Sequence, residues 1–233
     1  MTSDYAGYSE WKRWDPSQFM VCGPYEQRYY KGELGGLELA GRKIVELGFG
    51  NGGFLRYAME GGANVGGTEL LAEACARATE RGARVYMPDL SDALAESAGN
   101  FDLIVAFDVM EHMTREQLLV LFDTLAALLK SGGHVLARFP NAQSPLGCVT
   151  QNGDWTHRSA LSAQVLMQIL TGKPWALVRA GDPFMVLDAD SLVKRIGLRL
   201  RYAARRGIEW TVNRLYGLAI TLDPNVVVLL RRD

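Results

Sequence analysis

Lys43-Ile-Val-Glu-Leu-Gly-Phe-Gly-Asn-Gly-Gly-Phe-Leu55 is the stretch that decides the fold of this chain. Its apolar run, Ile44–Leu47, predicts a buried strand, and the pattern that follows the glycines predicts a helix. Glycine adopts backbone conformations that other residues avoid, so a glycine turn between a strand and a helix lets the backbone approach a ligand closely. An acid, Glu46, stands just before the first glycine and bears on which ligand that is.

Strand-like and helix-like patterns alternate along the rest of the chain. This alternation predicts an α/β fold in which helices cover both faces of a parallel sheet. Such sheets bind ligands beyond the carboxyl ends of their strands. The predicted strands are residues 43–47, 63–68, 84–86, 102–107, 133–139, 176–182 and 225–230. The predicted helices are residues 24–39, 52–60, 70–80, 90–97, 114–130 and 160–171.

Two segments depart from this alternation. Residues 1–39 are predicted to form an N-terminal arm and helix that cover the ligand site, whereas residues 40–233 form the main domain. Within that domain, residues 187–219 carry two helical patterns between the last two strands, and we predict a helical insertion over one edge of the site. The arm is rich in aromatic residues that would pack on the body, namely Tyr5, Tyr8, Trp11, Trp14 and Phe19.

Composition narrows the classes of function. The 233 residues have a formal net charge of −1, so no field of the whole protein attracts nucleic acid. Three cysteines without metal or redox spacing, and a polar N-terminus without a signal peptide, predict a cytoplasmic protein. One region is basic, because residues 191–233 hold nine Lys or Arg against three acids. That excess is typical of a solvated helix face; the alternative is peripheral contact with an anionic membrane surface.

The glycine turn also satisfies the G-x-G-x-x-G pattern of dinucleotide-binding enzymes, from Gly48 to Gly53. An acid about 20 residues later, Glu69, suits a ribose diol in either class of ligand. Glu46 distinguishes between the two classes of ligand, because a carboxylate at the mouth of the turn would repel a pyrophosphate and suit a cationic ligand such as a sulfonium. A nicotinamide (NAD)-dependent oxidoreductase is the alternative, and a binding module without catalysis is the third hypothesis.

Two later segments complete a family resemblance. Asn100-Phe-Asp-Leu-Ile-Val-Ala-Phe-Asp-Val-Met-Glu-His-Met113 is a predicted strand that ends in polar groups, and Leu129-Lys-Ser-Gly-Gly-His-Val-Leu-Ala-Arg-Phe-Pro-Asn141 combines a Gly-Gly turn with a buried strand. With the glycine turn, they make residues 40–140 resemble a class I S-adenosylmethionine-dependent methyltransferase. The resemblance implies a Rossmann-like, seven-stranded, mostly parallel sheet with an antiparallel last strand, and S-adenosyl-L-methionine as the cofactor.

The resemblance also implies which residues would hold the methionine end of the cofactor. Glu46 would organise that end, directly or through water. Phe107 and Asp108 would line the pocket floor beside the sulfonium. The turn against which the cofactor lies would consist of Gly48, Phe49, Gly50 and Gly52.

Four further residues match the nucleoside end of the cofactor. Glu69 would accept hydrogen bonds from both ribose hydroxyls, and Leu70 would pack on the adenine. Asp89 would accept a hydrogen bond from the adenine amino group, and Leu90 would offer its backbone N–H. The alternative for Asp89 is a cap on the helix that follows it.

Methyl transfer to a hydroxyl is helped by a general base, for which His or a carboxylate is the usual choice. His157 lies in a long polar loop, and we predict it as the catalytic base with Asp154 to orient it; the alternative is that His157 only anchors the loop. His112, at the end of the fourth predicted strand, is the second catalytic candidate. His134 lies inside a predicted strand, where a structural role is expected.

The run Asp108-Val-Met-Glu-His112 raises the question of a metal. Some hydroxyl methyltransferases of this class bind magnesium through an acid-x-x-Glu-His run, but the run here is also similar to one in many members that need no metal. Hard cations prefer several oxygen ligands, and His is a poor ligand for magnesium. We therefore predict no metal site.

The acceptor is indicated by two features. Asp108-Val-Met-Glu111 lacks the prolines of the run that methyltransferases of nucleic-acid bases share, which excludes a nucleic-acid substrate. Residues 139–145, followed by Gly153–His157, resemble bacterial surface-glycan (O-antigen type) methyltransferases. We predict transfer to a hydroxyl of a sugar or glycan precursor, on whose face Trp155, Trp11 or Trp14 could stack. The alternative is another small molecule with an oxygen or nitrogen acceptor.

Overall fold

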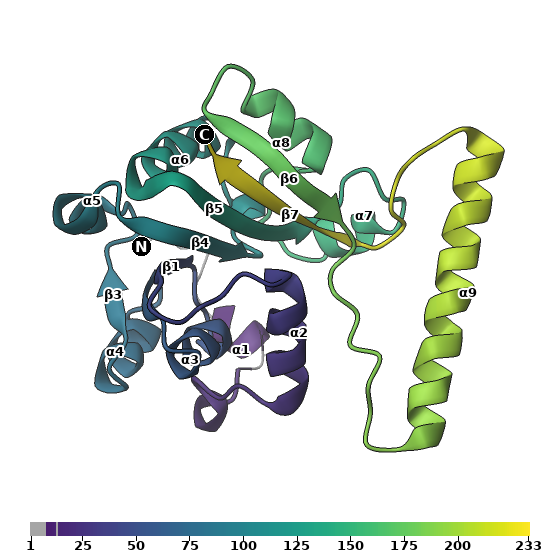
Figure 1. The fold of residues 1–233 in the computed structure, drawn as a ribbon, viewed down its shortest axis with the longest axis horizontal. Helices are drawn as coiled ribbons and strands as arrows, with labels where there is room; N and C mark the ends of the chain where they lie inside the picture. Colours follow the sequence, from purple (N-terminus) through teal and green to yellow (C-terminus); the bar gives the residue numbers. More distant parts are fainter. Residues whose placement is uncertain (1–7, 13) are drawn as a thin grey trace.

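A single seven-stranded sheet forms the centre of the molecule in the computed structural model, which describes residues 8–12 and 14–233 (Figure 1). The strand order is β3-β2-β1-β4-β5-β7-β6. The neighbouring strands from β3 through β2, β1 and β4 to β5 pair in parallel. Strand β7 pairs antiparallel with both of its neighbours, β5 and β6. The fold predicted from the sequence is therefore confirmed, including the antiparallel last strand. The strands are β1 Lys43–Leu47, β2 Asn64–Thr68, β3 Arg84–Tyr86, β4 Phe101–Phe107, β5 Leu129–Pro140, β6 Trp175–Gly181 and β7 Asn225–Arg232.

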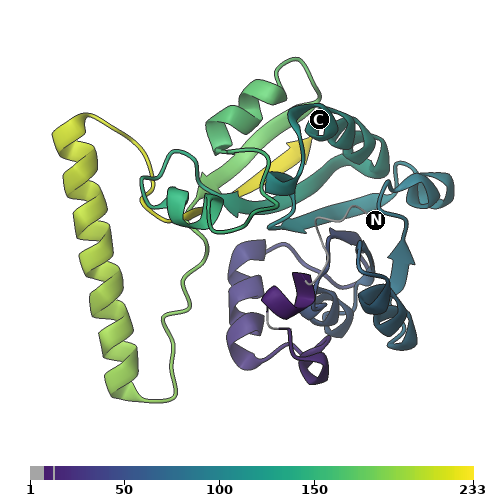
Figure 2. The same cartoon turned by 180° about the vertical axis from the view of Figure 1, so that it is seen from behind.

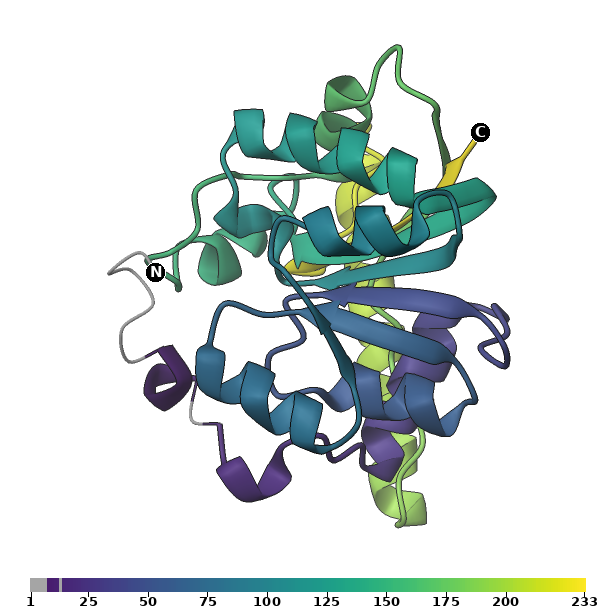
Figure 3. The same ribbon diagram turned by 90° about the vertical axis from the view of Figure 1, so that its left-hand side faces the viewer.

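Helices cover both faces of the sheet, as the edge-on view of Figure 3 shows. Successive residues of a strand point to opposite faces, so Val45 and Leu47 belong to the apolar cluster with α5, α6 and α8, whereas Ile44 belongs to the cluster with α2, α3 and α4. The helices are α1 Tyr8–Trp11, α2 Pro24–Leu34, α3 Gly53–Glu60, α4 Ala72–Glu80, α5 Ser91–Ser97, α6 Arg115–Leu128, α7 Gly147–Gln151, α8 Ala163–Ile169 and α9 Leu192–Tyr216, with short 3₁₀ turns η2 Pro16–Gln18 and η3 Met110–His112.

Three features depart clearly from the sequence prediction, whereas the ends of the other predicted elements shift by about three residues at most. Helix α2 ends at Leu34 rather than at residue 39, because Gly35 takes the left-handed conformation (φ +59°) that terminates a helix. Strand β5 begins at Leu129, where it pairs with Phe101 before a register shift, so the predicted Gly-Gly turn lies inside the strand. The long loop after β5 contains the short helix α7, which its polar sequence did not reveal.

The region between β6 and β7 also differs from its prediction in detail. The two expected helical patterns form one continuous helix, α9, of 25 residues. Figures 1 and 2 show α9 standing apart from the sheet, joined to it by an extended segment before it and a short one after it. Within the residues described, no helix is both long and apolar enough to cross a bilayer.

The N-terminal segment packs against the α3 side of the molecule. Phe19 and Met20 are buried in the apolar cluster there, and Met20 donates its N–H to the carbonyl of Asn51 in the glycine turn (N···O 2.7 Å). Trp11 is about half exposed. Tyr5, which was predicted to pack with these residues, lies outside the described part of the chain.

Burial predicts a large difference between two positions on one helix, α6. Phe122 is fully buried and meets the Trp175 ring edge-on (centroids 5.6 Å apart), whereas Val120 is 67% exposed. We expect Phe122→Ala to lower the free energy of unfolding by about 3–5 kcal/mol, because a cavity remains. Val120→Ala, the control on the same helix, should change it by less than about 0.5 kcal/mol. Urea unfolding followed by circular dichroism measures both, and equal effects would contradict the assigned core.

Candidate active site

A cavity of about 650 Å³ lies at the carboxyl ends of β1, β2 and β4. This volume is within the usual range for small-molecule sites. The parallel pairing brings these strand ends together, since Leu47 pairs with Ala106 and Glu46 with Val105. The sequence-predicted residues that line the cavity are Glu46, Gly48, Phe49, Gly50, Glu69, Leu70, Phe107, Asp108 and His112.

The glycine turn forms one wall of this cavity. Gly48, Gly50 and Gly52 all have positive φ, between +53° and +73°. A Cβ on Gly52 would lie 2.6 Å from Met20 Cγ, and one on Gly48 would lie 2.8 Å from a Val109 methyl. A Cβ on Gly50 would lie 3.0 Å from the Trp14 ring, so all three glycines let neighbouring side chains pack closely on the turn.

Glu46 is the buried acid of the site. Its side chain is only 4% exposed and points to the face that α3 covers. Burial raises the pKa of Glu46 well above its ordinary value; the Leu55 N–H opposes this effect, and Glu69 adds to it. Its Oε2 atom has no hydrogen-bond partner among the described residues. A buried carboxylate oxygen without a donor is costly, so the site favours a ligand that brings a donor or a positive charge.

Glu69 fastens the glycine turn to the end of β2. Its Oε2 accepts a hydrogen bond from the Gly50 N–H (2.8 Å), and its Oε1 accepts bonds from the N–H groups of Leu70 and Leu71 (2.6 and 3.1 Å). A carboxylate oxygen can accept two hydrogen bonds, so Oε1 is already fully used and Oε2 can accept one more. Glu69 therefore retains acceptor capacity toward the cavity, while Leu70, 46% exposed, presents an apolar surface beside it.

The structure does not bring Asp89 and Leu90 to the cavity, whose wall is formed at this point by Pro88. Asp89 is exposed, and its Oδ1 accepts hydrogen bonds from the N–H and the hydroxyl of Ser91 (3.0 and 2.7 Å). Leu90 is buried and donates its N–H to the Met87 carbonyl (2.9 Å). These contacts of Asp89 agree with the alternative role, in which it caps the start of the helix that follows. A role in binding adenine stays a prediction for Asp89 and for Leu90.

Asp108 ends β4 in a strained conformation. Its φ is +57°, which a residue with a Cβ rarely adopts. Arg138, on the neighbouring strand β5, donates hydrogen bonds to both carboxylate oxygens of Asp108, with Nε 3.0 Å from Oδ1. Arg138 also donates to the Tyr29 hydroxyl (2.6 Å). A bidentate pair of this kind fixes direction as well as charge, so Asp108 is held in place beside the cavity.

The two histidines lie together at the other side of the cavity. The rings of His112 and His157 are 4.7 Å apart. Only His112 lines the cavity; the side chain of His157 is 8% exposed, and its Nδ1 lies 3.0 Å from the Gln151 carbonyl. Burial and, to a smaller extent, the charge of the neighbouring His157 lower the pKa of His112 below its ordinary value, so His112 is neutral near pH 7. Asp154 is buried behind both rings.

Comparison with known proteins decides the family. A model of a methyltransferase domain family matches residues 28–209. The ubiquinone biosynthesis O-methyltransferase of Cupriavidus pinatubonensis is 33% identical over 231 residues, which are 94% of this chain and 85% of that enzyme.

The chain belongs to the class I S-adenosylmethionine-dependent methyltransferase family.

Other relatives match a shorter part. The ubiquinone biosynthesis O-methyltransferase of Vibrio parahaemolyticus is 31% identical over 103 residues, which span 43% of its length. In fold, the protein is similar to an S-adenosylmethionine-dependent methyltransferase of Archaeoglobus fulgidus (TM-score 0.62, 18% identity, 98% of this chain and 99% of that one). The family assignment replaces the nicotinamide alternative. The names of these relatives concern ubiquinone, so they do not support the predicted glycan acceptor.

The residues present fit the cofactor of this methyltransferase family. The left-handed glycine turn brings its backbone to the cavity wall, and the unpaired Glu46 Oε2 suits the cationic amino group of a methionine moiety. Tyr30 and Phe107 stack with their ring centroids 5.9 Å apart and line the cavity. Aromatic faces attract a positive charge, so these rings would suit a sulfonium.

Sequence reasoning missed several residues of the cavity wall. Arg138 had a signal, because a charged residue inside an otherwise apolar strand needs a partner. Lys12 and Tyr30 come from the N-terminal segment, and Arg158 follows the loop with His157. Nothing in the local sequence of these three indicates which strand end they would reach.

The position of Glu69 predicts a loss of cofactor affinity in Glu69→Ala. We expect S-adenosylmethionine binding to weaken by about 1–3 kcal/mol, because charge-assisted hydrogen bonds and a fastener of the glycine turn are both removed. Isothermal titration calorimetry measures the change. Glu73→Ala is the control, since Glu73 pairs with Arg77 on the surface of α4. Unchanged binding in Glu69→Ala would remove Glu69 from the ribose role.

The buried Glu46 carboxyl leads to opposite predictions for protein stability and for cofactor binding when it is replaced. Because burial raises the pKa of Glu46 above its ordinary 4.5, wild-type protein loses stability as the pH rises from about that value toward the folded-state pKa. Glu46→Gln abolishes this titration. Without cofactor, the variant should equal the wild type near pH 4 and exceed its free energy of unfolding by about 1–3 kcal/mol at pH 8.

Thermal and urea unfolding across this pH range test the expectation, and calorimetry should show weaker cofactor binding by the same variant. A Glu46→Gln protein that is less stable than the wild type at pH 8 would show that the carboxylate has a stabilising partner.

Proposed function

We propose that the protein transfers a methyl group from S-adenosylmethionine to a hydroxyl of a small molecule. The observation that carries the proposal is a cavity with two chemically different walls: the glycine turn with Glu46 and Glu69 on one side, and the polar residues His112, Gln117 and Arg158 on the other. Relatives named O-methyltransferase support a hydroxyl rather than an amine acceptor.

S-adenosylmethionine supplies a methyl group bonded to a positively charged sulfur. Because that methyl group is already activated, the main tasks of the protein are alignment and exclusion of water. Glu69 and the glycine turn would hold the nucleoside, and Glu46 the amino acid end. Asp108 is paired with Arg138, whose guanidinium lies 5.3 Å from the centroid of the Phe107 ring, so the negative charge at this end of the cavity comes from Glu46 and Glu69. These groups favour a cation at one end of the cavity and leave the other end to the acceptor.

The finer identity of the acceptor has unequal support. The relatives' names favour a hydroxylated small molecule of the kind used in ubiquinone biosynthesis. The sugar or glycan hydroxyl rests on the sequence of the loop after β5. Trp155, predicted to stack on a sugar, is 94% exposed and is not part of the cavity wall, whereas Trp14 is. The sugar acceptor therefore becomes the second arm of the test.

His157 was predicted as the general base, and this role stays a prediction. His157 lies behind His112 with respect to the cavity, so a direct proton transfer from the acceptor falls more naturally to His112. Thr156 joins the two parts of this region, because its hydroxyl contacts His112 Nδ1 (2.9 Å) and Asp154 Oδ1 (2.6 Å).

A turnover screen tests the proposed function. The purified protein, with S-adenosylmethionine, is offered dihydroxylated aromatic compounds, free sugars and primary amines in parallel, and S-adenosylhomocysteine formation is measured. We expect turnover with a hydroxylated acceptor and none with its O-methyl ether, which is the matched control. Turnover with amines alone would overturn the hydroxyl assignment, and turnover with sugars alone would restore the glycan acceptor.

A further inference from the structure

Three potential metal ligands converge beside the cavity. Single ligand atoms of Glu111, His112 and His157 all lie within 4.8 Å of one another. Glu111 and His112 belong to η3 after β4, whereas His157 comes from the loop after α7. Backbone hydrogen bonds hold the two segments together, since the N–H groups of Arg158 and Ser159 both donate to the Glu111 carbonyl (2.7 and 3.0 Å). The group is therefore built by the fold and does not depend on flexible side chains.

The ring of His157 is oriented by its hydrogen bond. The Gln151 carbonyl can only accept, so the contact of 3.0 Å with Nδ1 requires a proton on that nitrogen. In the neutral ring, Nε2 then carries a lone pair. Nε2 faces two carboxylates, with Glu111 Oε1 at 3.9 Å and Asp154 Oδ2 at 3.8 Å. A lone pair directed at carboxylate oxygens is unfavourable unless a proton or a metal cation lies between them.

The ring of His112 has the same tautomer for a similar reason. The Thr156 hydroxyl donates its one proton to Asp154 Oδ1 (2.6 Å), because a carboxylate oxygen only accepts. The contact of 2.9 Å between Thr156 Oγ1 and His112 Nδ1 then requires His112 to donate from Nδ1. Histidines whose Nδ1–H is held by an acceptor present Nε2 as a ligand, which is the usual arrangement around protein-bound metals.

Glu111 supplies the charge of the group. Its side chain is 1% exposed, and Glu111 Oε2 has no hydrogen-bond partner within the described part of the chain. An isolated buried carboxylate is costly, and fixing a cation is one way in which proteins offset that cost. Asp108 adds to the negative potential at Glu111, whereas the cations of Arg138 and Lys12 oppose it.

We propose that Glu111, His112 and His157 bind one divalent transition-metal ion of the zinc class. Two imidazoles and one carboxylate are a common ligand set for zinc, whereas magnesium prefers oxygen alone. Metal–ligand bonds of about 2.0–2.2 Å place ligand atoms about 3–4 Å apart, so the observed group needs to contract only slightly. This proposal replaces the sequence-based expectation of no metal, which considered magnesium at Asp108–His112 and lacked His157.

A role for the ion follows if the proposed function holds, and this step rests on it. His112 lines the cavity, so coordination positions without a protein ligand would face the acceptor. A hydroxyl bound to the ion would lose its proton to water more readily, because the metal stabilises the resulting oxygen anion. The O–H bond would break at that step. The oxygen lone pair would then form the O–CH₃ bond while the S–CH₃ bond breaks, and the electron pair of the broken bond would stay on the sulfur of S-adenosylhomocysteine. The ion would then activate the acceptor hydroxyl, which is the role that the sequence analysis predicted for a histidine base.

Metal binding is tested without cofactor or acceptor, so its failure is separate from failure of the methyltransferase assignment. The metal-free full chain is titrated with Zn²⁺ by calorimetry and with Co²⁺ by visible spectroscopy, in a Cys148→Ser background that removes the exposed thiol. We expect one ion per chain. His157→Gln should bind at least about 100-fold more weakly, beyond the usual effect of losing a second-shell partner.

His134→Gln is the matched control, because His134 lies on β5 and is not a member of the ligand group. It should bind as the wild type does. Circular dichroism confirms that each variant is folded, and Glu111→Gln provides a second loss-of-ligand variant if His157→Gln is not. Equal binding by the wild type and both ligand variants would overturn the site, as would binding lost equally in His134→Gln. A folded wild type that binds no Zn²⁺ or Co²⁺ would return the histidines to the base mechanism.

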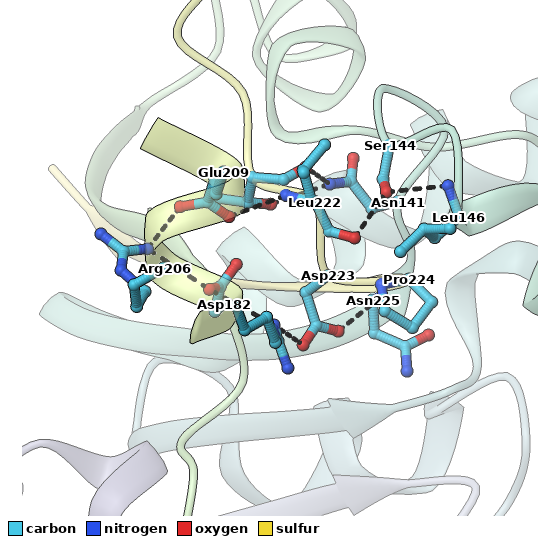
Figure 4. A network of polar contacts seen from close by, with 12 residues as sticks. Asn141, Ser144, Leu146, Asp182, Arg206, Glu209, Leu222, Asp223, Pro224 and Asn225 are labelled. Carbon is cyan, nitrogen blue, oxygen red and sulfur yellow. Dashed lines mark hydrogen bonds and ion pairs between the residues drawn. The ribbon is translucent and has the colours of Figure 1, made fainter. Parts of the chain in front are cut away.

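A second, independent observation concerns α9, whose apolar side faces away from the molecule. Its polar side attaches the helix to the body: Glu209 accepts the Leu222 N–H (2.9 Å), and Arg206 pairs with Asp182 (3.6 Å), as Figure 4 shows. Asn213 donates to the Ile220 carbonyl (2.8 Å). The opposite side is an exposed apolar stripe in which each side chain is 49–79% exposed, formed by Leu192, Val193, Ile196, Leu200, Ile208, Trp210 and Leu215.

The charges of α9 indicate what this stripe contacts. The helix carries seven Lys or Arg and one acid, Glu209, which is buried against the body. An amphipathic helix with cations beside an apolar stripe is typical of segments that lie in the interface of an anionic membrane. A second copy of α9 would face the same cations without exposed acids on either helix, so self-association lacks charge complementarity.

We propose that α9 docks the protein on an anionic lipid surface through this stripe. Co-sedimentation is measured with phosphatidylcholine vesicles with and without phosphatidylglycerol. We expect binding to the anionic vesicles only, and weaker binding at high salt, where charges are screened. Leu200→Glu should abolish it. Val120→Glu on α6 is the matched control, since Val120 and Leu200 are 67% and 66% exposed.

Two outcomes would overturn this second proposal. One is equal sedimentation with neutral and anionic vesicles by wild type and Leu200→Glu alike. The other is a dimer in light scattering that Leu200→Glu converts to a monomer, because the stripe would then be an interface between two copies.

Discussion

The left-handed backbone of the glycine turn after β1 is the constraint on which the rest of the site depends. Positive φ at Gly48 and Gly50 aims the turn away from the sheet, so that the Gly50 N–H reaches the Glu69 carboxylate at the end of β2. This bond connects two neighbouring strand ends and defines one wall of the cavity. The N-terminal segment then packs on the turn through Met20, which occupies the space that a side chain on Gly52 would need.

Carboxylates accumulate around that turn, and their arrangement separates two kinds of site. Asp108 is compensated within the protein, because Arg138 holds both of its oxygens. Glu46 and Glu111 each keep one buried oxygen without a partner among the described residues. A protein that keeps such groups gives up stability, and the usual reason is a ligand that completes them. Glu46 faces the cofactor side, whereas Glu111 faces the histidines.

The sequence predicted the sheet and the cofactor side well because both follow from local patterns. Ile44–Leu47 with the glycines is a strand and a turn in any context, and parallel strands bring Glu46, Glu69 and Asp108 to one edge. The predicted element boundaries were wrong where a single backbone conformation or strand pairing sets them. Gly35 ends α2 early, and the pairing of Leu129 with Phe101 starts β5 early. Arg138 could have been found, since a charge in a buried strand requires a partner.

The histidine side could not be predicted, because it depends on how a long loop returns to the strand end. The sequence placed His112 and His157 as separate candidates 45 positions apart, and the backbone bonds of Arg158 and Ser159 to Glu111, together with the contact between Thr156 and His112, bring them together. These contacts change the chemistry of both rings. A single histidine in a polar loop is most simply a base, but here both Nδ1 protons are already committed, and Nε2 of His157 lies 3.9 Å from the buried Glu111 carboxylate. A proton shared between Glu111 and Nε2 of His157 would complete this group, and the proposed metal ion would take the place of that proton.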